Sequence, residues 1–193
     1  MIKALTDIEI DISRIRELWN QKYEYITKLL PTEKAYATIQ VYNKDVTDPT
    51  HYAKFPTAVE LPMTFMDWQI THDDNVGTMY SYETTNGQTY HTFLCKENDD
   101  EVASIISPVQ QIRNKIQYIY QTKGSSLAWH TDDDSTGTRM HVVLESNRSA
   151  NIMTKEKKYY FPADSIYTLE TNTTLHRVPK QCGKRLHLTV NIL

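Results

Sequence analysis

The chain has 193 residues, of which 39% are hydrophobic and 23% charged, which is enough for one domain with a sizeable core. Its 21 basic and 24 acidic side chains give a net charge of -3, so the composition provides no positive field for nucleic acid or anionic lipid. Five glycines are too few and too far apart for a phosphate-binding loop, which excludes Rossmann and P-loop nucleotide sites.

The first thirty residues predict a helix. Apolar residues recur at helical spacing over residues 11–30, and Pro31 ends the pattern. Prolines and polar residues then predict loop with short extended pieces over the next thirty or so residues, around Pro49, Pro56 and Pro62.

A hairpin and a second helix are expected next. Residues 78–84 and 88–95 flank Asn86-Gly87, a dipeptide that favours a tight hairpin turn. Residues 97–101 predict an acidic connection. Ser107 and Pro108 then have the pattern of a helix start, which predicts a short helix ending near residue 114.

The last eighty residues predict a β-rich unit, because short β-prone runs alternate with turn residues. The expected strands are residues 116–121, 126–130, 138–145, 150–154, 159–161, 165–170, 174–178 and 185–192. Eight short strands at this spacing predict a sandwich or a jelly roll. We expect one domain, in which residues 1–115 form a helical and hairpin support for a core formed by residues 116–193.

The cysteine content and the N-terminal residues predict the cellular compartment of the protein. Cys95 and Cys182 are too few for a disulfide framework, and acidic residues near the N-terminus interrupt any signal-peptide pattern. No stretch approaches the ~18 apolar residues of a membrane span. We therefore expect a cytoplasmic protein with no membrane partner.

Three residues form a candidate metal site. His130 and Asp132 are two positions apart, so on a strand both point to one face, and His176 follows near another expected strand. Two imidazoles and one carboxylate on one face suit Fe(II) and leave positions open for a bidentate cosubstrate and dioxygen. The same residues could instead lie in an exposed, solvated turn.

Two pairs of basic residues accompany this set. Arg139 with His141, and Arg185 with His187, each stand two apart among apolar residues of the opposite parity. An arginine fork matches a carboxylate, so these pairs favour a dicarboxylate cosubstrate. The apolar positions would then pack outward against the N-terminal helices. Alternatively, the polar face of an ordinary half-buried sheet would face solvent.

These residues resemble the aspartyl/asparaginyl β-hydroxylase-like branch of the Fe(II)/2-oxoglutarate dioxygenases, over about the last ninety residues. In that family an Arg and a His follow the first metal-binding His at +9 and +11, as Arg139 and His141 follow His130. The resemblance implies a double-stranded β-helix core, a cupin-like jelly roll. It also implies Fe(II) bound by His130, Asp132 and His176.

Further roles follow from the resemblance. It implies that Arg139, His141 and Arg185 bind 2-oxoglutarate, and that the protein hydroxylates an amino-acid side chain, protein-bound or free, with formation of succinate and CO2. Desaturation or demethylation stays open, as does a small-molecule or a polypeptide substrate, whereas nucleic acid is not predicted. Because Asp132 occupies the position that chloride would need, a halogenase is disfavoured.

Other interpretations of these residues remain. Tyr118 and Tyr120 could bond the cosubstrate, or each could be a packing residue of the core. The same His, Asp and Arg set could belong to a non-catalytic jelly-roll module that binds a metal or an anion. A zinc hydrolase would also use two His and one Asp, but it gives the two basic pairs no role. The isolated His51, His72 and His91 predict surface or core roles.

Overall fold

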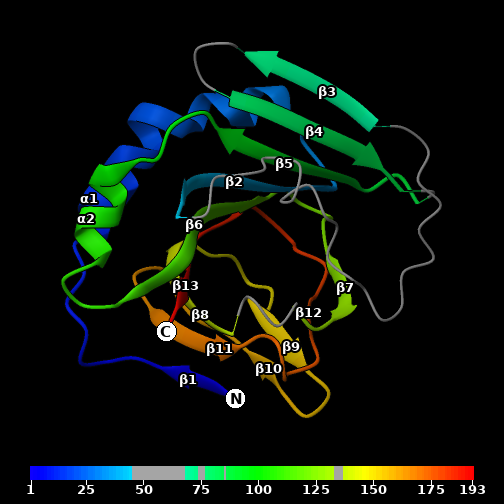
Figure 1. Cartoon of the computed structure of the whole chain (residues 1–193). Coiled ribbons are helices and arrows are strands. Elements are labelled where there is room, and N and C mark those ends of the chain that lie inside the picture. The colour runs from blue at the N-terminus through cyan, green and yellow to red at the C-terminus, as the bar shows by residue number, and fades with distance from the viewer. Residues whose placement is uncertain (45–67, 74–76, 85, 133–136) are drawn as a thin grey trace.

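A computed structural model describes residues 1–44, 68–73, 77–84, 86–132 and 137–193 (Figure 1). The chain is mainly β with supporting helices. In order, its elements are β1 (Ile2–Ala4), α1 (Ile12–Leu18), η1 (Trp19–Tyr23), η2 (Glu24–Leu29), β2 (Ala35–Asn43), β3 (Trp68–Asp73), β4 (Gly77–Glu83), β5 (Thr89–Cys95), α2 (Asp100–Ile106), β6 (Ile112–Gln121), β7 (Leu127–His130), β8 (Thr138–Glu145), β9 (Ile152–Thr154), β10 (Lys158–Tyr159), β11 (Ile166–Glu170), β12 (His176–Val178) and β13 (Arg185–Ile192).

The last eight strands form a jelly roll. A nine-stranded sheet has the order β1-β11-β8-β13-β6-β2-β5-β4-β3, and a four-stranded sheet has the order β10-β9-β12-β7. From β6 to β13 the chain contributes four strands to each sheet, as an eight-stranded double-sheet jelly roll does. The predicted double-stranded β-helix core is therefore confirmed. All eight strands predicted from the sequence are present, and β8 and β13 have the predicted bounds.

The core lies between the large sheet and the helices. In the β6–β13 pair, Tyr118 stands opposite Leu188 and Tyr120 opposite Leu186, so these four side chains share one face of the sheet. They belong to the same buried apolar cluster as helical residues such as Trp19. Figure 1 shows α1 and α2 beside each other along this face. The predicted outward packing of the apolar positions is confirmed, which leaves the other face of β6, β8 and β13 turned toward the small sheet.

The predicted first helix is present but changes its winding. Asp11 caps α1 by accepting a hydrogen bond from the Arg14 backbone N–H, 2.9 Å away. The segment continues as one π-helical stretch, η1, and one 3-10 stretch, η2, and ends just before Pro31. The rings of Trp19 and Tyr23 both pack against the Tyr118 ring, at centre-to-centre distances of 5.0 and 5.4 Å. These are the first and last residues of η1, so the whole π-helical stretch is held against β6.

The predicted hairpin is also confirmed. β4 and β5 pair antiparallel, and Gly87 in their turn has a φ of 75°, a conformation that glycine adopts without strain. β5 in turn pairs with β2 in parallel. The prediction of loop with short extended pieces after Pro31 understates β2, a strand of nine residues in which Ala35, Ala37 and Ile39 belong to the core cluster and the residues between them do not. Pro49, Pro56 and Pro62 lie outside the described residues.

The second helix lies earlier than predicted. The expected helix over residues 107–114 is wrong, because α2 ends at Ile106 and the strand β6 begins at Ile112. The acidic residues that predicted a connection start the helix instead. Asp99 accepts hydrogen bonds from the backbone N–H groups of Glu101 and Val102, and acidic side chains in the first turn favour the helix dipole.

Several remaining residues can be placed. His91 is buried and bonds Ser81 and Thr89 through its two ring nitrogens, which confirms the core role predicted for it. Neither His51 nor the His72 side chain belongs to the described part of the chain. Cys95 and Cys182 are free thiols. Among the described helices, none has the length and apolar character needed to cross a bilayer.

Candidate metal centre

The predicted metal ligands lie together on two neighbouring strands. β7 and β12 pair antiparallel, and His130 stands directly opposite His176, with ring centres 4.3 Å apart. Asp132 follows β7 by two residues. One ligand atom from each of the three side chains lies within 4.8 Å of the others, and both histidines are buried. Two imidazoles and one carboxylate at this spacing can share one cation.

Hydrogen bonds fix which imidazole nitrogen faces the centre. The Nδ1 of His130 lies 2.7 Å from the Ala128 carbonyl oxygen, and the Nδ1 of His176 lies 2.7 Å from that of Thr174. A carbonyl oxygen only accepts, so each Nδ1 carries the proton and each Nε2 has a free electron pair. A backbone carbonyl on the distal nitrogen is the usual way in which proteins orient metal-binding histidines.

The charge states of the three side chains suit a cation. Burial lowers the pKa of both histidines, that of His176 to about 4, so both imidazoles are neutral at neutral pH. Burial alone would raise the pKa of Asp132, but the positive charge of the neighbouring Arg139 outweighs it and holds that pKa below its usual value. The carboxylate is therefore ionised.

Asp132 is anchored on both sides. Its backbone N–H donates to the Thr171 carbonyl oxygen 2.9 Å away, which ties the end of β7 to the turn before β12. Its side-chain Oδ1 lies 3.6 Å from His130 Nε2, and its Oδ2 lies 2.8 Å from Arg139 Nη1. The Arg139 contact is an ion pair rather than an aligned hydrogen bond. The predicted cosubstrate residue Arg139 thus lies against a metal ligand.

Arg185 is a fully buried cation. Its residue is 2% exposed; Nη1 bonds the Gln121 side-chain oxygen, Nη2 lies 3.2 Å from His187 Nδ1, and Nε has no partner. Within the described part of the chain, Arg185 forms no salt bridge with a carboxylate. Because an uncompensated buried charge costs several kcal/mol, at about the scale of a broken buried ion pair, this guanidinium indicates an anionic partner that is not among the described residues.

His141 lies beside His187, one of the two partners of the Arg185 guanidinium. It stacks on the Tyr167 ring at 4.6 Å, and its Nδ1 is 3.5 Å from His187 Nδ1. Burial, together with the charges of Arg139 and Arg185, holds the pKa of His141 well below its usual value, so the ring is neutral. Its Nε2 has no hydrogen-bond partner among the described residues.

The structure contradicts a cosubstrate role for Tyr118 and Tyr120. Register places both on the helix-facing side of β6, opposite Leu188 and Leu186, whereas Arg185 stands opposite Gln121 on the other side. The Tyr118 hydroxyl donates to the Ile15 carbonyl oxygen at 3.2 Å, and Tyr120 packs against Trp19. Both are packing residues, because side chains of even and odd positions in a strand point to opposite faces.

Other residues of the inward face were not given a role from the sequence. They are Tyr36, Gln121, Tyr167 and Asn191. Tyr167 stands opposite His141 in the β8–β11 pair, and Tyr36 stands beside Gln121 in the β2–β6 pair. Strand parity alone could have found Tyr167. Tyr36 required knowledge that β2 pairs with β6.

The donor set fits a bound metal and anion. Three buried polar atoms of inward-facing side chains lack a hydrogen-bond partner among the described residues: His141 Nε2, Tyr167 Oη and Arg185 Nε. Burial raises the pKa of Tyr167 to about 12, and the nearby positive charge of Arg185 opposes part of this rise. Buried polar atoms in native proteins are bonded to protein, water, ions or ligands, so their concentration here favours a ligand between the sheets.

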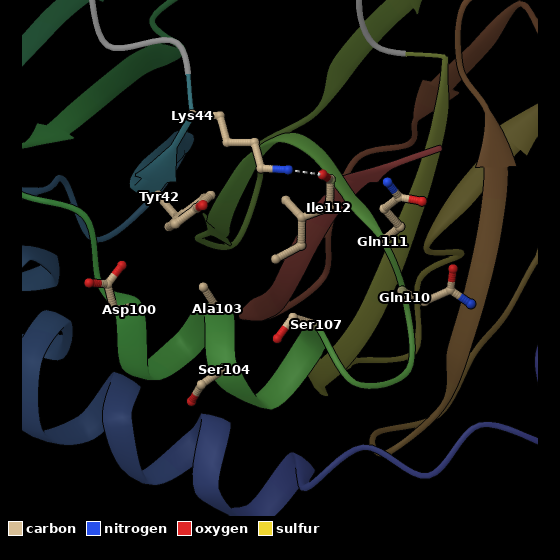
Figure 2. Close-up of a pocket in the computed structure, with 9 residues that line it drawn as sticks. All are labelled: Tyr42, Lys44, Asp100, Ala103, Ser104, Ser107, Gln110, Gln111 and Ile112. Carbon is tan, nitrogen blue, oxygen red and sulfur yellow. Dashed lines mark hydrogen bonds between the residues drawn. The ribbon is translucent and has the colours of Figure 1, made fainter.

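A separate groove lies on another part of the surface. Figure 2 shows this groove of about 430 Å³, where the Lys44 ammonium donates to the Ile112 carbonyl oxygen 2.8 Å away. Its lining residues are Tyr42, Lys44, Asp100, Ala103, Ser104, Ser107, Gln110, Gln111 and Ile112. None of the candidate metal ligands lines it, so it is not the site that the sequence predicted.

Comparison with known proteins gives distant structural similarity alone. No protein-family model and no curated protein matches the chain. Among solved structures, the chain is similar to a 2OG-Fe(II) oxygenase family oxidoreductase from Burkholderia pseudomallei, with 9% identity and a TM-score of 0.42. The match covers 64% of this chain and 71% of that chain. A similarity this distant assigns no function, so the function below is argued from the side chains.

Proposed function

We propose that the protein is an Fe(II)- and 2-oxoglutarate-dependent oxygenase. The observation that carries the proposal is a pair of sites on facing strands: a set of two neutral histidines and one ionised carboxylate, and a buried guanidinium that has no carboxylate partner among the described residues. A two-histidine, one-carboxylate set favours Fe(II) with open positions for a bidentate ligand and dioxygen. An arginine fork selects a carboxylate.

Each part of the chain has a task in this function. His130, Asp132 and His176 would hold the iron, which when bound supplies oxygen activation coupled to the conversion of 2-oxoglutarate to succinate and CO2. Arg185 would bind the distal carboxylate of 2-oxoglutarate, and its contacts with Gln121 and His187 fix the direction of its fork.

Neighbouring side chains would complete the environment. His141 stays neutral, so its unpartnered Nε2 can hold a hydrogen bond to the cosubstrate or to water beside the metal. An apolar cluster of Tyr36, Tyr90, Ile119, Leu127 and Val178 lies at the end of β7 and β12 away from the metal ligands. It excludes water from that end of the interior, which strengthens the electrostatic contacts there.

We place the activity in the aspartyl/asparaginyl β-hydroxylase-like branch, acting on an amino-acid side chain that is either free or part of a polypeptide. The support is the shared arrangement of His130, Arg139, His141, His176 and Arg185 along the chain. Asp132 distinguishes this chain from branch members that lack the metal carboxylate, and it lies within reach of both histidines.

The proposal predicts slow succinate formation without the natural substrate. Purified protein supplied with Fe(II), 2-oxoglutarate and oxygen is expected to release succinate, measured by mass spectrometry, at a rate proportional to protein concentration. The matched control is a His130→Ala, Asp132→Ala double variant, which lacks two of the three metal ligands and is expected to give only the background rate.

Two outcomes separate the competing functions. Succinate from the unmodified protein at no more than the rate of the double variant would contradict an oxygenase. If the unmodified protein forms no succinate but still binds metal and 2-oxoglutarate, a non-catalytic binding module accounts for the same side chains. If it binds metal but not 2-oxoglutarate, neither the oxygenase nor the dicarboxylate site stands.

A further inference from the structure

A continuous chain of side chains leads to the metal-binding carboxylate. Arg139 Nε lies 3.1 Å from Asn191 Oδ1, and Asn191 Nδ2 lies 2.9 Å from Asn114 Oδ1. At its other end, Arg139 Nη1 reaches Asp132 Oδ2 at 2.8 Å. Arg139 and Asp132 are only about one-tenth exposed, and Asn191 is buried. Four residues from three strands and the end of β7 thus form one connected polar set.

The direction of each contact is fixed by chemistry. A guanidinium only donates, so Asn191 must present its oxygen to Arg139 and its amide nitrogen to Asn114. With Nε engaged by Asn191, the guanidinium plane is held while Nη1 faces Asp132. Cross-strand pairing supports this, because Asn191 stands directly opposite Arg139 in the β8–β13 register.

The two oxygens of Asp132 therefore have different surroundings. Oδ2 faces the Arg139 guanidinium, and Oδ1 faces His130 Nε2. The oxygen that faces the arginine is the less available of the two for a metal, because the guanidinium occupies part of its surroundings.

We propose that Arg139 is a positioning residue for the metal ligand Asp132, with Asn191 as its anchor, so that Asp132 binds the metal through Oδ1 alone. The inference rests on the proposed metal site, and it differs from the cosubstrate role that the sequence resemblance implies for Arg139. The charge of Arg139 is matched by Asp132, whereas the charge of Arg185 is matched by no described carboxylate. Of the two arginines, Arg185 is the one left to bind an anionic ligand.

The test measures metal affinity rather than turnover. Metal-free protein is titrated with Co(II), whose visible absorption reports the ligand set, in the unmodified chain and in the variants Arg139→Lys and Asn191→Leu. Lysine keeps the charge but cannot contact Asn191 and Asp132 through separate nitrogens of a fixed plane. Loss of an outer contact to a metal ligand typically costs 10- to 100-fold in metal affinity, so we expect both variants to bind Co(II) at least about tenfold more weakly.

Arg177→Lys is the matched control. Arg177 is the neighbour of His176 in β12, but its guanidinium lies over the Trp129 ring, 5.0 Å from the ring centre, and contacts the Met153 sulfur instead of Asp132. We expect this variant to keep the Co(II) affinity and spectrum of the unmodified chain. With Co(II) saturating, we expect 2-oxoglutarate affinity in Arg139→Lys to stay within about threefold of the unmodified value, since Arg185 is intact.

The outcomes distinguish this inference from the proposed function. If Arg139→Lys binds Co(II) normally but loses affinity for 2-oxoglutarate, Arg139 is a cosubstrate ligand and the inference is overturned. Unchanged affinity for both ligands also overturns it, while the proposed function stands. An unmodified chain that binds no Co(II) would remove the metal site itself. Should Asn191→Leu fail to fold, as judged by circular dichroism, Arg139→Lys decides alone.

Discussion

Replacing Arg185 with alanine is expected to weaken 2-oxoglutarate binding by about 30-fold or more, because truncating one partner of a buried, hydrogen-bonded charge pair costs about 2–5 kcal/mol. Metal affinity should change little, since Arg185 contacts Gln121 and His187 and none of the candidate metal ligands. Calorimetric titration of the Mn(II)-loaded protein with 2-oxoglutarate measures the first quantity, and Mn(II) titration measures the second.

Stability provides the control for this variant. An Arg185→Met chain keeps much of the volume and removes a buried charge, so its unfolding free energy without ligands is expected to equal or exceed that of the unmodified protein. Loss of 2-oxoglutarate affinity in a protein of undiminished stability is then a loss of binding and not of fold. Equal losses of metal and 2-oxoglutarate affinity would contradict the role of Arg185, as would unchanged 2-oxoglutarate affinity.

Replacing His176 with alanine is expected to abolish Fe(II) binding in the concentration range where the unmodified protein saturates. His176 offers Nε2 to the centre and is one of only three side-chain ligands proposed there. Loss of a direct ligand should cost more than the 10- to 100-fold typical of an outer contact. Anaerobic Fe(II) titration or metal analysis after gel filtration measures it.

His91→Ala is the matched substitution. Burial lowers the pKa of His91 to about 4, so it is a buried, neutral imidazole like His176, but its nitrogens contact Ser81 and Thr89. This variant is expected to keep the unmodified Fe(II) affinity. Comparable Fe(II) affinity in His176→Ala and in the unmodified chain would show that the metal, if one binds, is held elsewhere.

Strand periodicity made the barrel and its inward polar residues predictable. In β13, and in β8 as far as Val142, apolar residues alternate with Arg139, His141, Arg185 and His187, so the sequence separates two faces without knowledge of the partner strands. The contrast between hydrocarbon and charge carries this information. The same contrast placed the apolar positions against the helices.

The roles of the tyrosines in β6 could not be predicted in this way. Tyr118 and Tyr120 alternate with Ile119 and Gln121, and residues of both parities are buried, so composition does not distinguish the two faces. Which face meets the helices is decided by the pairing of β6 with β13, a contact between residues about seventy positions apart. Strand parity separated the residues of β6 into two sets, but it did not tell which set faces the helices and which faces the interior of the jelly roll.

The contact between Arg139 and Asp132 was equally invisible in the sequence. Their spacing indicated that both belong to the site, yet the distance between their atoms depends on where the end of β7 lies relative to β8 in the fold. Tyr36 illustrates the same limit, because it reaches the inward face only through the pairing of β2 with β6. Spacing within one strand is readable, whereas contacts between strands depend on register.

Anaerobic titration of the unmodified protein with Fe(II) and 2-oxoglutarate together tests the central claim most directly. If His130, Asp132 and His176 hold one iron beside the Arg185 carboxylate site, 2-oxoglutarate should chelate that iron and give a visible charge-transfer absorption that neither ligand gives alone. The absorption should saturate at one iron and one 2-oxoglutarate per chain. Binding of both ligands without this absorption would place them apart and contradict the shared site.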